Sequence, residues 1–307
     1  MGRVTSTPAA PGWLVWAALW TIYLVWGSTY LAIAVMVETI PPVLGGGVRF
    51  AFAGVVLLVA VGLRGGLEPL RAGRLQLAGV ALVGILLCSA NALVGIAERE
   101  VPSGLAALLI ASVPLWVILL RGVLGDPTSR ATVGAVAIGF AGVALLLAPG
   151  EQTGGASLAG LLTVVAAAVS WASGSVAAPR VPLPGHRVAA SGWQMLFGGL
   201  ACAAAGLALG EAGDVDLAQV SARSWVGLAY LVVFGSLLAF TAYSWLLQNA
   251  PLTKVSTYAY VNPVVAVLLG WIVLDEVVTG LTLAGAAIIV VSVALVIRLE
   301  ARGRTRR

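Results

Sequence analysis

The side chains best suited to bind a small molecule lie inside long apolar stretches of this sequence. They are Trp26, Ser28, Tyr30, Arg49, Asn91, Trp171, Gln194, Tyr243, Tyr258 and Asn262. Aromatic rings with polar tips, together with amides and a guanidinium, suit a site for amphipathic organic molecules. The same residue types also join helices by hydrogen bonds or form aromatic belts at membrane surfaces. For each residue alone, packing is therefore the favoured interpretation, although some subset must line the pathway of a transporter.

Arg49 is the one ionisable residue placed well inside such a stretch. An unpaired arginine at the centre of a bilayer costs roughly 2.5–3.5 kcal/mol on insertion scales. Its guanidinium could bind a substrate carboxylate or carbonyl, or its long stem could carry the charge to the membrane surface. Gln194, at the matching place in the second half of the chain, keeps hydrogen bonding without the charge.

Pro114 and Pro263 fall near the middle of matching stretches. Proline has no N–H, and its ring clashes with the carbonyl four residues earlier. The carbonyls of Ile110 and Ala259 are therefore predicted to lose their helical partners. Such groups are tolerated where protein or a water-filled cavity satisfies them, so paired breaks indicate a central substrate site with gating at the breaks. A simple packing kink is the alternative.

Groups that catalysis or metal binding would need are scarce. Glu98 and Asp126 lie at the ends of apolar stretches rather than inside them, and the lone histidine, His186, falls in a loop. No phosphate-binding glycine loop is present. We therefore predict no enzyme activity, no catalytic residues, no cofactor and no metal. A carboxylate proton relay is not evident either, although a proton or a counter-substrate stays open as a partner.

The composition requires a membrane protein. Of 307 residues, 60% are hydrophobic and only 9% are charged, whereas a soluble domain has about a quarter of its residues charged. The net charge is +5, but the basic residues fall in short loops and a C-terminal tail. Such a distribution favours contact with anionic lipid and gives no basis for a nucleic-acid partner.

Ten stretches are long enough to cross a bilayer, since a span needs roughly 17–25 apolar residues. They are about Trp13–Val35, Pro42–Leu63, Gln76–Ala97, Ser103–Val123, Ala131–Ala148, Ser157–Ala178, Val188–Leu209, Ser224–Leu247, Leu252–Leu274 and Gly280–Ile297. Arginine and lysine gather in alternate loops, and the positive-inside rule then places both ends of the chain in the cytoplasm.

The two halves of the chain repeat one another. Trp26/Trp171 and Arg49/Gln194 lie 145 residues apart, and Pro114/Pro263 and Asp126/Asp275 lie 149 apart. Five helices per half is an odd number, so the second half must cross the membrane upside down, as in secondary transporters. The predicted organisation is a cytoplasmic tail (1–12), a first repeat (13–149), a second repeat (150–298) and a basic cytoplasmic tail (299–307).

Several motifs carry a resemblance to a known family. They are Trp26-Gly27-Ser28-Thr29-Tyr30, Val101-Pro102-Ser103-Gly104-Leu105-Ala106-Ala107, Gly235-Ser236, and Tyr258-Ala259-Tyr260-Val261-Asn262-Pro263-Val264 with the later Asp275-Glu276. On these motifs the chain resembles the EamA-type branch of the drug/metabolite transporter superfamily, in the subgroup of YedA-like exporters. One departure is Gly125-Asp126-Pro127, where family repeats often carry Gly-Glu.

The resemblance implies ten transmembrane helices in two inverted five-helix repeats around a shared cavity. It also implies export of amino acids, related metabolites or toxic analogues across the bacterial inner membrane. Our leading hypothesis is alternating access, in which helices one to four rock against helices six to nine. A lipid-linked carrier flippase of the same fold is the alternative and would open laterally between helices. The sequence leaves the substrate, the coupling ion and the oligomeric state open.

Overall fold

The computed structural model describes residues 11–148, 150, 153–250, 252–255 and 257–305. Residues 1–10 of the predicted N-terminal tail, the boundary residue Pro149, and Arg306 and Arg307 of the predicted basic tail lie outside the described residues. Over the described ranges the regular structure is helical, without strands. This confirms the predicted all-α class.

The helices follow the predicted spans closely. The first repeat contains α1 (Gly12–Met36), α2 (Pro42–Gly65), α3 (Arg74–Ala97), α4 (Ser103–Ile110), α5 (Val113–Val123) and α6 (Arg130–Leu147). The second contains α7 (Leu158–Ala177), α8 (Arg187–Ala208), α9 (Ala222–Tyr230), the π-helix η5 (Leu231–Leu238), α10 (Ala239–Asn249), α11 (Leu252–Val255), α12 (Tyr258–Leu274) and α13 (Gly280–Thr305). In the described part of the chain, nine helices are long and apolar enough to cross a membrane when Ser103–Val123 (α4 and α5) and Ala222–Leu246 (α9, η5 and part of α10) are each taken as one helix. The shorter α12 lies in the remaining predicted span.

Serine side chains set where three of these helices begin. Ser129, Ser157 and Ser221 precede α6, α7 and α9, and each accepts a hydrogen bond of 3.0 Å from the backbone N–H three residues later. The first N–H groups of a helix have no partner within it, so such caps satisfy donors that would otherwise be unpaired.

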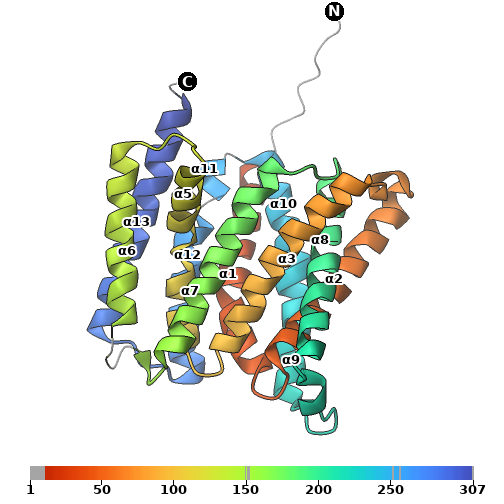
Figure 1. Cartoon of the computed structure of the whole chain (residues 1–307), viewed down its shortest axis with the longest axis horizontal. Helices are drawn as coiled ribbons and strands as arrows, with labels where there is room; N and C mark the ends of the chain where they lie inside the picture. Colours follow the sequence, from red (N-terminus) through yellow and green to blue (C-terminus); the bar gives the residue numbers. More distant parts are fainter. Residues whose placement is uncertain (1–10, 149, 151–152, 251, 256, 306–307) are drawn as a thin grey trace, which may run out of the picture.

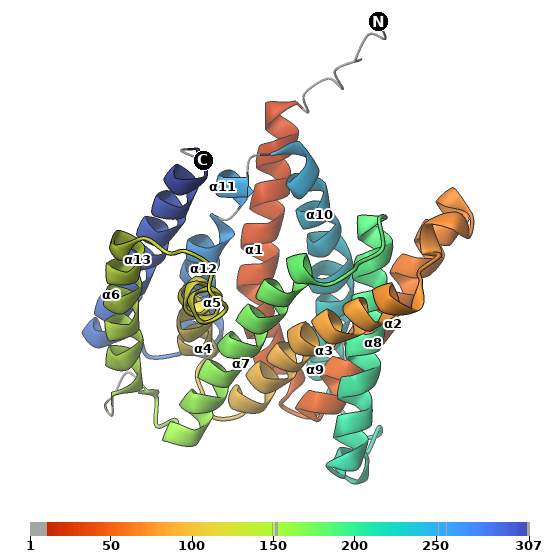
Figure 2. The same ribbon diagram turned by 45° about the horizontal axis from the view of Figure 1, so that its top comes forward.

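The second repeat is inverted relative to the first. Helix α1 begins, and α13 ends, at one end of the bundle, which we call the terminal end (Figures 1 and 2). Helix α7, the first of the second repeat, begins at the other end, which we call the opposite end (Figure 1). Equivalent helices of the two repeats therefore run in opposite directions, as an odd number of helices per repeat requires.

The two repeats meet most extensively where α2 crosses α8. Glycines allow the two backbones to touch there. A Cβ added to Gly47 would lie 2.4 Å from the backbone nitrogen of Ala203, and one added to Gly199 would lie 2.2 Å from that of Ala51. Small residues permit this approach between membrane helices, where packing rather than the hydrophobic effect drives association. This crossing therefore forms a tight seam between the repeats.

Helices α6 and α13 stand side by side at one edge of the bundle (Figures 1 and 2). The hydroxyl of Ser292 on α13 donates a 2.6 Å hydrogen bond to the carbonyl of Ala135 on α6. Gly142 and Gly285 again sit where a side chain would collide with the facing helix. This pair contains the fifth and tenth spans.

The two mid-span prolines occupy different local structures. The fourth span is interrupted just before Pro114, because α4 ends at Ile110 and α5 begins at Val113. Pro263 instead lies inside α12, and the interruption of that span lies further towards the terminal end, between α11 and α12. The eighth predicted span contains a π-helical segment, η5, that the hydrophobic pattern of the sequence does not predict.

Candidate functional site

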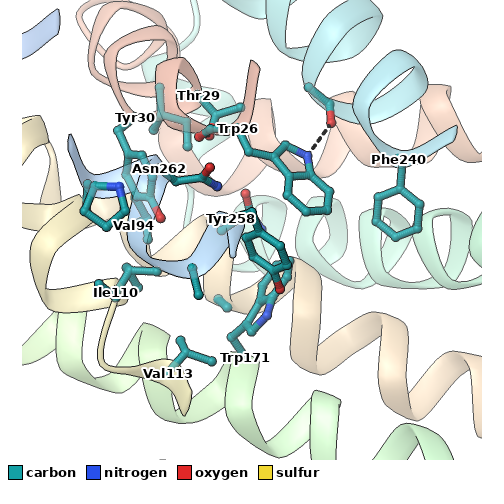
Figure 3. A pocket seen from close by; sticks show the side chains of 18 of the residues that line it. Trp26, Thr29, Tyr30, Val94, Ile110, Val113, Trp171, Phe240, Tyr258 and Asn262 are labelled. Carbon is teal, nitrogen blue, oxygen red and sulfur yellow. Dashed lines mark hydrogen bonds between the residues drawn. The ribbon is translucent and has the colours of Figure 1, made fainter. Parts of the chain in front are cut away.

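A cavity lies in the middle of the bundle and is lined by both repeats. It encloses about 1000 Å³ of space not filled by atoms, including its mouth. Nine of the sequence-predicted residues line it, and Figure 3 shows several of them pointing towards one another. They are Trp26, Tyr30, Arg49, Asn91, Pro114, Trp171, Tyr258, Asn262 and Pro263.

Three sequence-predicted residues lie outside the cavity lining. Ser28 lies on another face of α1, where its hydroxyl is 2.6 Å from that of Tyr230. Tyr243 lies behind the lining, with its ring 5.2 Å from that of Trp26. Gln194 lies where α8 meets α3, since a Cβ on Gly84 would be 2.1 Å from its carbonyl oxygen. These contacts join helices.

The aromatic side of the cavity is built on Trp26. Its indole nitrogen donates a 3.2 Å hydrogen bond to the carbonyl of Gly235 (Figure 3). Its ring meets that of Tyr258 edge-on, with the centroids 5.2 Å apart. The hydrogen bond and the edge-to-face contact together fix the orientation of the indole. Helices α1, η5 and α12 thus meet at one rigid aromatic group.

Arg49 is the charged residue of the described cavity lining. It is only 4% exposed, and its Nε donates a 3.0 Å hydrogen bond to the hydroxyl of Ser236 on η5. Its guanidinium carbon lies 4.5 Å from the centre of the Phe50 ring. A guanidinium carries five N–H donors in a planar fork that matches a carboxylate. The Ser236 bond uses one of them, so Arg49 is held in place while keeping donors for a ligand.

Asn262 supplies an acceptor near the aromatic groups (Figure 3). Its side chain is 9% exposed, and within the described residues no group donates a hydrogen bond to its Oδ1. A buried acceptor without a partner costs about 1–3 kcal/mol. A ligand with an N–H or O–H group would relieve that cost, and the backbone of α12 carries this residue beside Tyr258.

No binding role is predicted from the sequence for Gly235, Ser236 or Phe240. Gly235 and Phe240 line the cavity, and Ser236 positions Arg49. Gly235 and Ser236 belong to η5, and π-helical turns are often found at functional sites. The Gly235-Ser236 motif was the available signal, but its role depends on a local helix geometry that no hydrophobic pattern reveals.

The fold defines the class of this protein: a multi-pass membrane transporter whose cavity is shared by two inverted repeats. The EamA-like transporter family matches residues 13–148 and 158–298, and the chain belongs to this family. The match falls twice on the chain, once in each half. The family places the chain among transporters rather than enzymes.

Individual relatives agree with this assignment. The chain is 37% identical to the inner membrane transporter YedA of Escherichia coli (strain K12), over 92% of this chain and 90% of that protein. It is 23% identical to a protein of Salmonella typhimurium named "Probable amino-acid metabolite efflux pump", over 87% of this chain and 89% of that one. A solved crystal structure superposes with a TM-score of 0.62 at 25% identity, covering 94% of this chain and 98% of the other.

Proposed function

We propose that this transporter exports small amphipathic metabolites that carry a carboxylate and an N–H donor, such as amino acids or their analogues. The observation that carries the proposal is the pairing of Arg49, contributed by the first repeat, with Asn262, contributed by the second, around one cavity. Arg49 would bind the carboxylate, and Oδ1 of Asn262 would accept from the N–H group. The name of the relative from Salmonella typhimurium points to the same substrate class.

The apolar part of the substrate would lie against the aromatic lining. Trp26 and Tyr258 have fixed orientations, and fixed rings bury apolar surface with little loss of side-chain freedom. Trp171 and Phe240 extend the same lining from α7 and α10. A site of this kind accepts apolar groups of different shapes while requiring the charged end.

Transport would proceed by alternating access between the two repeats. At the opposite end, α4 and α12 are in close contact, because a Cβ on Gly104 would lie 3.1 Å from Cα of Val267. We therefore take the opposite end to be closed in this structure. With both chain ends in the cytoplasm of a bacterial cell, the opposite end would face away from the cytoplasm, and its opening would release substrate.

The test is efflux of labelled amino acids and of the matching amides from liposomes containing the purified protein. The amide lacks the carboxylate but keeps the amino group and side chain. Loss of a hydrogen bond to a charged group is worth about 1.5–3 kcal/mol, or roughly a 10- to 150-fold change. We expect Arg49→Gln to slow efflux of the acid by about this factor while leaving that of the amide nearly unchanged.

Ser175→Ala is the matched control, because this hydroxyl lies on the exposed side of α7 and bonds the carbonyl of Trp171 on its own helix. If Arg49→Gln slowed efflux of the acid and of the amide equally, Arg49 would not be the group that binds the substrate carboxylate. If no soluble compound were transported but a labelled lipid-linked carrier crossed faster, the flippase hypothesis would replace the exporter.

A further inference from the structure

Glu98 is a buried carboxylate that the proposed substrate site does not use. It follows the last residue of α3 at the opposite end of the bundle and is 8% exposed. Neither of its carboxylate oxygens has a hydrogen-bond partner within the described residues. Two residues later, Glu100 is exposed and accepts a 2.8 Å hydrogen bond from Ser157. The fold thus covers Glu98 while leaving its neighbour in contact with solvent.

The groups around Glu98 disfavour its ionised form. Glu276, on the connection after α12, is close enough to repel it, and the hydroxyl of Tyr30 on α1 interacts with it electrostatically. The hydroxyl of Ser103 at the start of α4 is likewise buried and unpartnered among the described residues. On its own turn, Arg99 is exposed, and no described ion pair includes Glu98.

Glu276 has its own partners at this place. One of its oxygens accepts a 2.6 Å hydrogen bond from the N–H of Ser103, and the other accepts a 2.9 Å bond from the N–H of Gly104. A carboxylate at a helix N-terminus is stabilised in its ionised form by these donors and by the helix dipole. Glu276 therefore has two backbone donors, whereas Glu98 has none among the described residues.

Burial, and then repulsion by Glu276, raise the pKa of Glu98 well above the usual value for a glutamate. An ionised carboxylate without a partner is very unfavourable in a water-free site, and two neighbouring carboxylates do not both ionise easily. A bound proton removes both costs. Burial beside Glu276 therefore favours the protonated form of Glu98 in this structure.

We propose that Glu98 is a proton-binding site of the gate formed by α4 and α12: it holds a proton while the opposite end is closed and releases it to water when that end opens. The proposal rests on the alternating access proposed above. Opening would expose Glu98 and separate it from Glu276, so the carboxyl would ionise and its proton would pass to solvent. By linkage, acidity on that side stabilises the closed state.

The gate would also communicate with the substrate cavity. Tyr30 lines the cavity and interacts electrostatically with Glu98. Helix α4, whose N-terminus Glu276 caps, contributes Ala107 and Ile110 to the same lining. A change at the gate therefore reaches two walls of the cavity without any intermediate element.

The first test reads protonation directly, by infrared spectroscopy of the reconstituted protein across a pH series. We expect a protonated-carboxyl band at neutral pH in the wild type and in the control Glu100→Gln, and its loss in Glu98→Gln. Glu98→Asp keeps a titratable group and retains the band, which separates loss of the carboxyl from misfolding. A wild type without the band, or a Glu98→Gln variant that keeps it, would overturn the proposal. So would loss of the wild-type band on adding sodium ions, which would identify a sodium site.

The second test reads the gate through Val267→Cys, a position on α12 that faces α4, in a background where both native cysteines are alanine. We expect labelling by a membrane-impermeant thiol reagent to rise with pH more steeply than the thiolate fraction of a free cysteine does, and Glu98→Gln to lose this additional pH dependence. Equal pH dependence in both proteins would overturn the role in gating. Neither test needs a substrate, so a failed efflux assay would count against the proposed function and not against the proton site.

Discussion

The two ends of the bundle hold their helices together in different ways. At the opposite end, Glu276 accepts hydrogen bonds from two backbone N–H groups at the start of α4. At the terminal end, the residue that matches Glu276 after an offset of 149 is Pro127. Proline offers no carboxylate, and the neighbouring Asp126 instead binds two arginines, Arg121 at 3.0 Å and Arg180 at 2.6 Å.

This difference concerns the two equivalent turns: backbone N–H groups hold the one at the opposite end, and side-chain ion pairs hold the one at the terminal end. Hydrogen bonds to a charged group are worth about 1.5–3 kcal/mol, whereas exposed ion pairs contribute much less and are weakened by salt. The ion pairs extend to α13, because Arg121 also binds Glu300 at 2.7 Å. The equivalent turns of the two repeats thus make two unlike closures: a carboxylate cap at the opposite end and ion pairs at the terminal end.

Among the variants considered, Glu276→Ala should have the largest effect on closure of the opposite end. It leaves two N–H groups at the start of α4 without their acceptor, each at a cost of about 1–3 kcal/mol if they stay buried. We expect a lower unfolding temperature and a strong rise in thiol labelling at Val267→Cys. Both follow from loss of the contact between α4 and the connection after α12.

Glu211→Ala is the control for this change. Glu211 accepts hydrogen bonds from the N–H groups of Val43 and Leu44, at 3.3 and 2.6 Å, at the start of α2. Its removal costs stability in the same way but leaves the contact between α4 and α12 intact. If Glu211→Ala raised labelling at Val267→Cys as much as Glu276→Ala, the cap on α4 would have no special part in closure.

Gly270→Ala should have an intermediate effect on thiol labelling at Val267→Cys. The added Cβ would lie 2.3 Å from Oε2 of Glu276, so the carboxylate must move away from it. The displaced side chain can keep one of its two backbone bonds, and we therefore expect a smaller rise in labelling than for Glu276→Ala. Gly134→Ala, where a Cβ meets nothing within 4 Å, is the control. No change in labelling for Gly270→Ala would mean that the carboxylate can move without loosening the gate.

The fold followed from the sequence because the bilayer imposes span length and periodicity on any chain that crosses it. Part of the cavity lining could also be predicted from the sequence, since the residue types of Trp26, Tyr258 and Asn262 identify them as candidates. Ser28 and Gln194 were expected in the site, but the rotation of a helix about its axis is fixed by packing that one sequence does not show. The position of Glu98 at the end of an apolar stretch gives no sign of a buried site, and only the fold reveals that this carboxyl is buried and interacts with Glu276 and Tyr30.

The pH dependence of stability should be a smaller effect with a definite sign. In our proposal the folded protein holds a proton on Glu98, whereas the unfolded chain, with a glutamate pKa of about 4.3, gives that proton up above that pH. The stabilisation is present below that value and is lost as pH rises through the raised pKa of Glu98. We expect the unfolding free energy of the wild type to fall more steeply with pH than that of Glu98→Gln, by at most about 1.4 kcal/mol per pH unit for one proton. Parallel curves would show that Glu98 does not change protonation on folding.

Asp126→Asn should have the smallest effect on stability. Hydrogen bonds from Arg121 and then from Arg180 lower the pKa of Asp126, so its contribution to stability is present above the usual pKa of an aspartate and is lost as pH falls through the lowered one. The site is open to solvent, and we expect a slight loss of stability at low salt that disappears at about 1 M salt, where screening acts over about 3 Å.

The same variant tests whether the two ends act as one system. In alternating access, loosening the terminal end favours the state in which the opposite end is closed, so Asp126→Asn should leave labelling at Val267→Cys unchanged or lower it. An increase comparable to that of Glu276→Ala would mean that both ends open together. The two unlike closures would then stabilise the whole bundle rather than alternate, and the carboxylate cap on α4 would be a general element of stability.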